Sequence, residues 1–128
     1  TGSVDVFSAD IFITNSISSG ATLRGIVDFG NNFQSLSIGE SSGALTNELI
    51  SFIKGSYRLA YTSPTNSISA GLHTVSLSWD DGGYAIFLDG TNVTTVVLGV
   101  PSKAIATSNM RIGASAHPTF FLGKMKNV

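Results

Sequence analysis

Short stretches rich in β-branched and aromatic residues recur along this chain about every eight to twelve residues, and this spacing constrains the fold more than any other feature. Gly, Asn, Asp or Ser-Pro separates each stretch from the next, and no segment has the apolar period of an amphipathic helix. The stretches lie at residues 4–7, 10–14, 22–29, 33–38, 48–53, 57–61, 72–79, 84–88, 92–98, 109–114 and 120–125. Eleven short strands in 128 residues predict an all-β protein, a two-sheet antiparallel β-sandwich or jelly roll.

The clearest strand pattern begins at residue 72. Val, Leu and Trp alternate with Thr and Ser over residues 74–79, so one face of this strand is directed to the core and the other to solvent. Glycines at 82–83 and the Asp89-Gly90 pair predict turns, which gives a meander of three antiparallel strands. Trp79 falls on the apolar face, and we expect it in the core.

The composition excludes several kinds of partner. Charged residues make up 12% of the chain and the net charge is -1, whereas nucleic acids and anionic lipids need clustered Lys and Arg. No apolar run approaches the length of a membrane span, so we expect no membrane insertion. The polar surface must come from uncharged side chains, since 19 Ser, 12 Thr and 8 Asn accompany the 15 charged residues.

The whole chain, residues 1–128, is expected to form a single domain. The length suits one core, and neither a linker nor an internal repeat interrupts the pattern. The absence of Cys excludes disulfides, thiolate metal sites and Cys nucleophiles.

The run GLHTVSLSWDDGGYAIFLDG at residues 71–90 resembles the central hairpin of laminin-G-like domains of the concanavalin A-like lectin/glucanase superfamily. MRIGAS at 110–115 and FLGKMKNV at 121–128 resemble later strands of that family, and SLSIGESSGALTNELISFI at 35–53 is similar to a stretch of its bacterial and phage versions. The resemblance implies a jelly roll that serves mostly as a noncatalytic module binding glycans or proteins outside cells.

The sequence departs from the family at its C-terminal end. In the family the closing motif usually continues into a further strand that pairs with the N-terminal strand, whereas this sequence stops at Val128. We therefore expect an unpaired sheet edge, either because the chain was cut or because a neighbouring segment supplies the missing strand.

No catalytic residues are expected. Glucanases of the superfamily need paired carboxylates, carried as Glu-x-Asp-x-x-Glu, but the only Glu residues, Glu40 and Glu48, have no acidic partner at i+2 or i+4. A Ser-His-Asp arrangement is not excluded by counting, because Ser is abundant. We nevertheless interpret His73 as a packing and hydrogen-bonding residue and His117, before a proline, as a turn residue.

Calcium is the one cofactor that the resemblance suggests, because laminin-G-like domains often hold Ca²⁺ at a sheet edge. Asp28 and Asn31 are the best candidate ligands, since their loop offers a carboxylate and amide oxygens, the hard ligands that Ca²⁺ requires. Asp80 and Asp89 have a structural use instead, because Asp caps turns through nearby backbone groups.

These observations favour a noncatalytic recognition or adhesion module that binds glycan or a surface receptor, as part of an extracellular cell-surface protein or a phage tail fibre. The alternative is a structural subunit of an extracellular filament or virion, a homo-oligomer or polymer assembled by sandwich packing or strand donation. A nearly neutral surface supports this alternative, because burying charges is costly. The sequence identifies no ligand-binding residue, since most aromatic side chains are expected in the core.

Overall fold

The computed structural model describes residues 5–13, 17–18, 24–30, 34–38, 48–54, 57–62, 67–80, 83–99, 110–113 and 124–128. Within these ranges every regular element is a β-strand, and the strands form two large antiparallel sheets and one small one. The prediction of an all-β, two-sheet antiparallel sandwich is confirmed, while jelly-roll topology stays a prediction. The same ranges contain no helix with the length and apolar character needed to cross a membrane.

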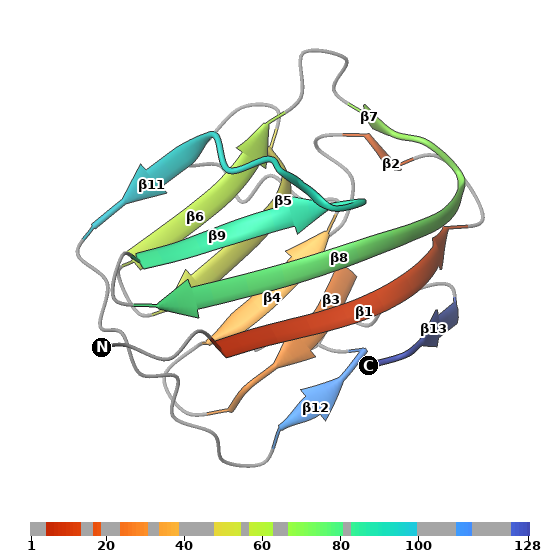
Figure 1. Ribbon diagram of the computed structural model, residues 1–128, viewed down its shortest axis with the longest axis horizontal. Coiled ribbons are helices and arrows are strands. Elements are labelled where there is room, and N and C mark those ends of the chain that lie inside the picture. The colour runs from red at the N-terminus through yellow and green to blue at the C-terminus, as the bar shows by residue number, and fades with distance from the viewer. Residues whose placement is uncertain are drawn as a thin grey trace.

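The first sheet has five strands in the order β10-β9-β8-β1-β13. The long central strands are β1 (Asp5–Ile13) and β8 (Gly71–Asp80), which pair along the whole length of β1. β9 (Gly83–Leu88) and β10 (Thr91–Asn92) continue the sheet on one side, and β13 (Lys124–Lys126) closes it on the other. In Figure 1, β9, β8 and β1 lie nearest the viewer.

The second sheet has six strands in the order β11-β6-β5-β4-β3-β12 and lies behind the first in Figure 1. Its strands are β3 (Arg24–Asp28), β4 (Ser35–Ile38), β5 (Glu48–Lys54), β6 (Tyr57–Thr62), β11 (Val96–Leu98) and β12 (Arg111–Ile112). A separate pair, β2 (Ile17–Ser18) with β7 (Ser67–Ile68), was not anticipated from the sequence.

The core lies between the two large sheets because alternate residues of each strand are directed inward. Phe52 of β5 and Tyr84 of β9 stack across this space with ring centroids 5.3 Å apart. Trp79 is half-buried and packs against the core, as expected, and it meets Phe29 edge-on at 6.2 Å. The opposite faces of β1, β8 and β9 carry the side chains that alternate with these buried residues.

Two strand predictions are corrected. Residues 4–7 and 10–14 were expected as separate strands, but β1 is continuous, because Ser8 faces outward and Ala9 is buried without interrupting the pairing with β8. Residues 92–98 were expected as one strand, but they divide between the sheets. Only Thr91–Asn92 pairs with β9, and the chain then crosses to pair with β6 as β11.

The closing segment pairs with part of the N-terminal strand, while the expected unpaired edge and missing further strand stay predictions. β13 pairs antiparallel with β1, with Asp10 opposite Lys126 and Phe12 opposite Lys124, so the closing segment itself supplies a strand. The pairing covers only residues 10–12 of β1, and no described residue pairs with residues 5–9 on that side. Asn127 has a positive φ of 54°, a left-handed conformation that lies outside the range of a β-strand, so β13 ends before it.

Candidate functional site

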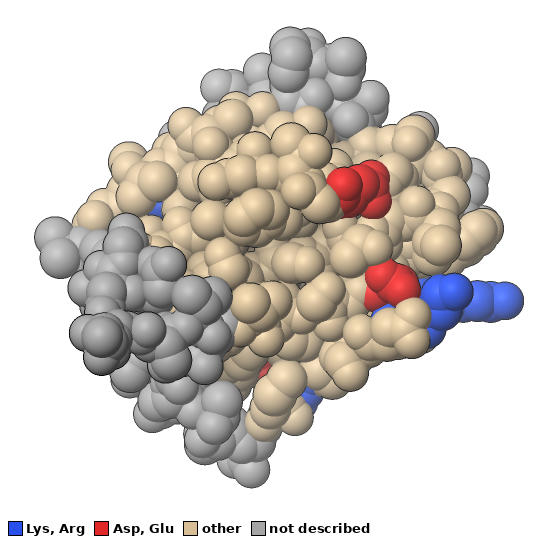
Figure 2. Space-filling model, viewed as in Figure 1, with Lys and Arg blue, Asp and Glu red and all other residues tan. Residues whose placement is uncertain are grey.

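The outward-facing side chains of β1, β8, β9 and β13 form one continuous surface, which we call the outer face. Its members are those that alternate with the buried residues of these strands: Val6, Ser8, Asp10, Phe12, Leu72, Thr74, Ser76, Ser78, Ala85, Phe87, Lys124 and Lys126. Figure 2 views the molecule from this side, and its described surface is mostly uncharged, with acidic groups in two main clusters and lysines at one edge. The nearly neutral surface expected from the composition is therefore found on the outer face of the five-stranded sheet.

Cross-strand pairs between β1 and β8 order the polar groups of the outer face. Ser76 Oγ donates to Ser8 Oγ at 3.0 Å, and Thr74 Oγ1 donates to Asp10 Oδ1 at 2.7 Å. On the other side of β1, Asn127 Nδ2 donates to Asp10 Oδ2 at 2.6 Å. Each oxygen of the Asp10 carboxylate is thus held by a donor and keeps further lone pairs for a ligand.

These donors also fix the charge of Asp10. The hydrogen bond from Thr74 and then that from Asn127 lower the pKa of Asp10 below its ordinary value, burial opposes them less strongly, and the positive charge of Lys126 adds the smallest lowering effect. Asp10 is therefore an ionised, oriented acceptor at neutral pH.

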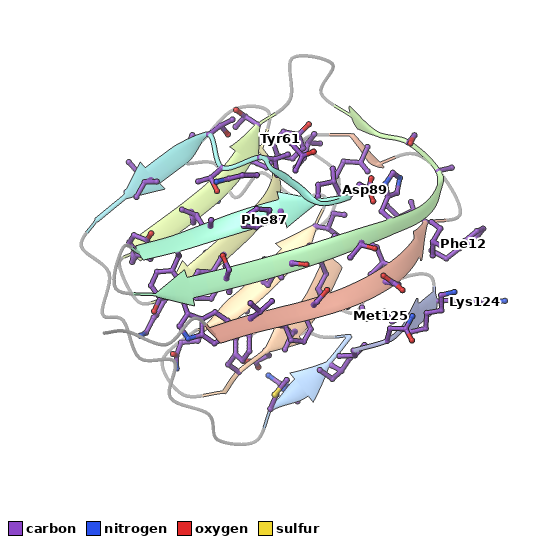
Figure 3. All side chains as sticks on the ribbon, viewed as in Figure 1. Phe12, Tyr61, Phe87, Asp89, Lys124 and Met125 are labelled. Atoms are coloured by element: carbon purple, nitrogen blue, oxygen red, sulfur yellow. The ribbon has the colours of Figure 1, made fainter. Side chains whose placement is uncertain are left out.

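Apolar side chains lie beside this carboxylate. Phe12 is 44% exposed and Leu72, its cross-strand neighbour, is 57% exposed. Together with Asp10, Lys124, Met125 and Lys126 they line a pocket of about 490 Å³, within the range of about 300–1,000 Å³ typical of small-molecule sites. Figure 3 shows Phe12, Met125 and Lys124 at the same end of the sheet. An exposed aromatic ring beside an ionised acceptor is the combination that sugar recognition uses.

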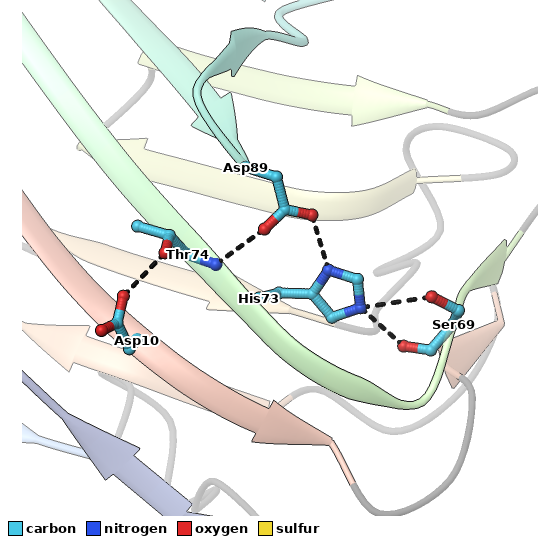
Figure 4. Close-up of polar contacts among 5 residues, drawn as sticks. All are labelled: Asp10, Ser69, His73, Thr74 and Asp89. Atoms are coloured by element: carbon cyan, nitrogen blue, oxygen red, sulfur yellow. Dashed lines mark hydrogen bonds and ion pairs between the residues drawn. The ribbon is translucent and has the colours of Figure 1, made fainter.

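A second polar cluster surrounds His73 at the end of β8 (Figure 4). His73 Nδ1 lies 2.7 Å from Asp89 Oδ2, and Nε2 lies 2.8 Å from the carbonyl oxygen of Ser69 and 3.3 Å from its Oγ. The other oxygen of Asp89 accepts from the Thr74 amide at 2.9 Å. The side chains of Ser69, His73 and Asp89 thus contact one another in the same sequence as those of a Ser-His-Asp triad.

The contacts of Nε2 differ from those of a triad histidine, which needs a free lone pair on Nε2 to accept the serine proton. Here Nε2 lies closest to a carbonyl oxygen and Nδ1 to a carboxylate, and both oxygens only accept, so the ring satisfies both contacts when both nitrogens carry hydrogen. In this arrangement the ring ties Ser69 and Asp89 to β8.

Opposing effects act on the pKa values of His73 and Asp89. Burial opposes the charge, but the hydrogen bonds to Asp89 and to the Ser69 backbone and the nearby carboxylate raise the pKa of His73 above its ordinary value. Burial likewise opposes the charge of Asp89, whose pKa is nevertheless lowered by the hydrogen bonds from His73 and Thr74. The prediction that His73 is a packing and hydrogen-bonding residue is confirmed.

The structure places one of the two predicted calcium ligands. Asp28 is buried and forms an ion pair with Arg111, whose Nε donates to Asp28 Oδ2 at 3.1 Å. Its other oxygen accepts from the Gly30 amide at 2.8 Å. Both oxygens are thus engaged within the chain, and Asn31 lies outside the described residues. Calcium binding by Asp28 and Asn31 stays a prediction, and no group of three His, Cys, Asp or Glu side chains is gathered among the described residues.

Of the other residues considered in the sequence, the structure describes the side chain of one and not those of the rest. Asp89 has a structural use, but the hydrogen bonds described for its side chain are to His73 and Thr74 of β8, so capping of its own turn, where its φ is 51°, stays a prediction. Glu40, His117 and the side chains of Glu48 and Asp80 lie outside the described part of the molecule. The sequence interpretation missed Asp10 and Phe12, although their i, i+2 spacing on a strand could have placed both on one face.

Comparison of the chain with protein-family models, with curated proteins and with solved structures returned no match.

Proposed function

We propose that this protein is a noncatalytic recognition module that binds glycan through the outer face of its five-stranded sheet. One observation carries the proposal: the exposed ring of Phe12 lies next to the ionised, doubly hydrogen-bonded carboxylate of Asp10, in one pocket. The apolar C–H face of a sugar ring packs on an aromatic side chain, while sugar hydroxyls donate to an oriented carboxylate.

The rest of the outer face supports an extended ligand. The hydroxyls of Ser8, Thr74 and Ser76 follow Asp10 along the paired strands β1 and β8, and Phe87 lies opposite Ser76 on β9. Hydroxyl groups both donate and accept, so such a row suits a chain of neutral polar units.

The resemblance to laminin-G-like domains of the concanavalin A-like superfamily supports the same reading. The segment that carries it, residues 71–90, contains β8 and β9 and so contributes part of the outer face. On this proposal the protein works outside cells, on a cell-surface protein or a phage tail fibre, with glycan or a glycosylated receptor as its partner.

A glycan array followed by calorimetric titration of the strongest ligand tests the proposal. We expect Phe12→Ala to weaken binding about tenfold, because the loss of a stacking ring costs about 1.5 kcal/mol. Leu98→Ala is the matched control, since Leu98 is equally exposed, at 44%, but lies on β11 of the other sheet. Equal effects of the two substitutions, or no bound glycan, would contradict the proposal.

One observation favours the alternative, a structural subunit that assembles with copies of itself. β13 covers only residues 10–12 of β1, and among the described residues nothing pairs with residues 5–9 on that side. Half of the backbone N–H and C=O groups of this stretch are directed away from β8 and can accept an added strand.

Light scattering across a concentration series tests this alternative. Assembly through the edge of β1 gives a mass that rises with concentration and returns to that of the monomer when Val6→Pro removes one amide that is directed away from β8. Val6 is 57% exposed, so this substitution leaves the core side chains unchanged. A constant monomer mass eliminates assembly through this edge.

A further inference from the structure

The charges around the Asp10–Phe12 pocket are not balanced. Its lining includes two ammonium groups, from Lys124 and Lys126, and one carboxylate, from Asp10. The pocket therefore has a net charge of +1, whereas the whole chain has a net charge of -1. Figure 3 labels Lys124 at the edge of the sheet, and in Figure 2 most of the visible blue of Lys and Arg lies at one edge of the outer face.

The register of β13 assigns different surroundings to the two lysines. Lys126 is opposite Asp10, and its charge contributes to the lowered pKa of that carboxyl group. Lys124 is opposite Phe12, which has no charge to offset it. The unbalanced positive charge of the pocket thus lies beside its exposed aromatic ring.

We propose that this pocket selects an acidic saccharide, one whose ring carries a carboxylate, over its neutral counterpart. The inference rests on the proposed glycan-binding function and names the ligand class of the same site. The sugar ring packs on Phe12 and Leu72, a ring hydroxyl donates to Asp10, and the sugar carboxylate meets the ammonium of Lys124.

The charges of the site agree with a ligand that has single, spaced carboxylates. A densely charged polyanion needs many cationic contacts for its phosphate or sulfate groups. The pocket offers only two lysines, and the carboxylate of Asp10 separates these lysines from the rest of the outer face. A neutral sugar makes the same ring and hydroxyl contacts but leaves Lys124 without an anion.

Trigalacturonate and its fully methyl-esterified form are a matched pair of probes, because they share the same sugar backbone and differ in the carboxylate charges that the methyl esters remove. We expect titration calorimetry at low salt to show the acid binding about fivefold more tightly than the ester, the effect of one partly exposed ion pair. Raising the salt concentration reduces the preference. A hyaluronan tetrasaccharide and its methyl ester repeat the comparison on a glucuronate backbone.

Variants at Lys124 separate charge recognition from glycan binding. Lys124→Gln should make acid and ester bind with equal affinity, whereas Lys124→Arg should keep the preference for the acid. If the wild-type protein binds acid and ester equally, or binds only neutral glycans on the array, the acidic-saccharide inference is overturned and the glycan-binding function stands. If no saccharide of any kind binds, both are overturned.

Discussion

Replacing His73 by Gln should remove a pH-dependent part of the stability. The wild-type imidazolium is held by Asp89 at 2.7 Å and by the Ser69 carbonyl at 2.8 Å, and these contacts raise its pKa above the ordinary value of 6.5. A group with a raised folded-state pKa stabilises the fold fully below its unfolded pKa, and this stabilisation is lost as pH rises through the folded-state pKa. The wild-type protein should therefore lose stability between pH 5.5 and pH 9, and His73→Gln should not.

The magnitude follows from the exposure of the two partners. A hydrogen bond to a charged group contributes about 1.5–3 kcal/mol when shielded, and an exposed ion pair contributes about 0.2–1 kcal/mol. The His73 side chain is 12% exposed but that of Asp89 is 50% exposed, so solvent screens the pair strongly. We expect about 1 kcal/mol at pH 5.5, which is about 4 °C in Tm for a domain of this size.

Urea unfolding at pH 5.5 and at pH 9 measures this difference directly. His117→Gln is the control, because the chain has only two His and no other side chain ordinarily titrates over most of this interval. Asp89→Asn should also reduce the pH dependence, and the double variant should show that the two effects are not additive. Equal pH slopes for wild type and His73→Gln, or an NMR-measured pKa of His73 at or below 6.5, would refute the reasoning.

Three further substitutions test the packing, a turn and an ion pair, each by urea unfolding. Phe52→Ala should cost about 3–5 kcal/mol, because Phe52 is fully buried, and a cost no larger than that of exposed Val97→Ala would contradict the assigned core. Gly90→Ala should cost about 1–2 kcal/mol from backbone strain alone, since φ is +83° and no atom lies within 4 Å of the added Cβ; an unchanged midpoint would mean that the turn differs. Asp28→Asn should cost about 1–3 kcal/mol by weakening the contact with Arg111, and added Ca²⁺ should not change the wild-type midpoint if that ion pair is the sole role of Asp28.

Local patterns predicted most of the strands because a strand that buries one face leaves a period of two in its own residues. β8 and β9 were read from such alternation and from the turn residues between them, and they differ from prediction by only one residue at an end. The predicted bounds were wrong where pairing with another strand, and not the local pattern, decides where a strand begins and ends. Residues 92–98 are β-forming throughout, but the chain leaves β9 after Asn92 because β6 offers a second pairing edge to Val96–Leu98.

The candidate site was less predictable than the strands. Asp10 is separated from Thr74 by 64 residues and from Asn127 by 117, so no local pattern links the carboxylate to its two donors. The same holds for His73 and Asp89, whose contact depends on β8 and β9 pairing in one register. Sequence composition indicated a neutral hydroxyl-rich surface but not which face would display it.

The sequence by itself determined the all-β class, the inward and outward faces of the central strands and the low charge of the surface, because each of these depends on neighbouring residues or on composition. Only the tertiary structure decided that β13 covers part of β1, that Asp10 and Phe12 share a pocket with two lysines, and that His73 bridges Asp89 and Ser69. The physical reason is that strand pairing joins residues distant in the chain, and one step of register would place each of these side chains on the opposite face.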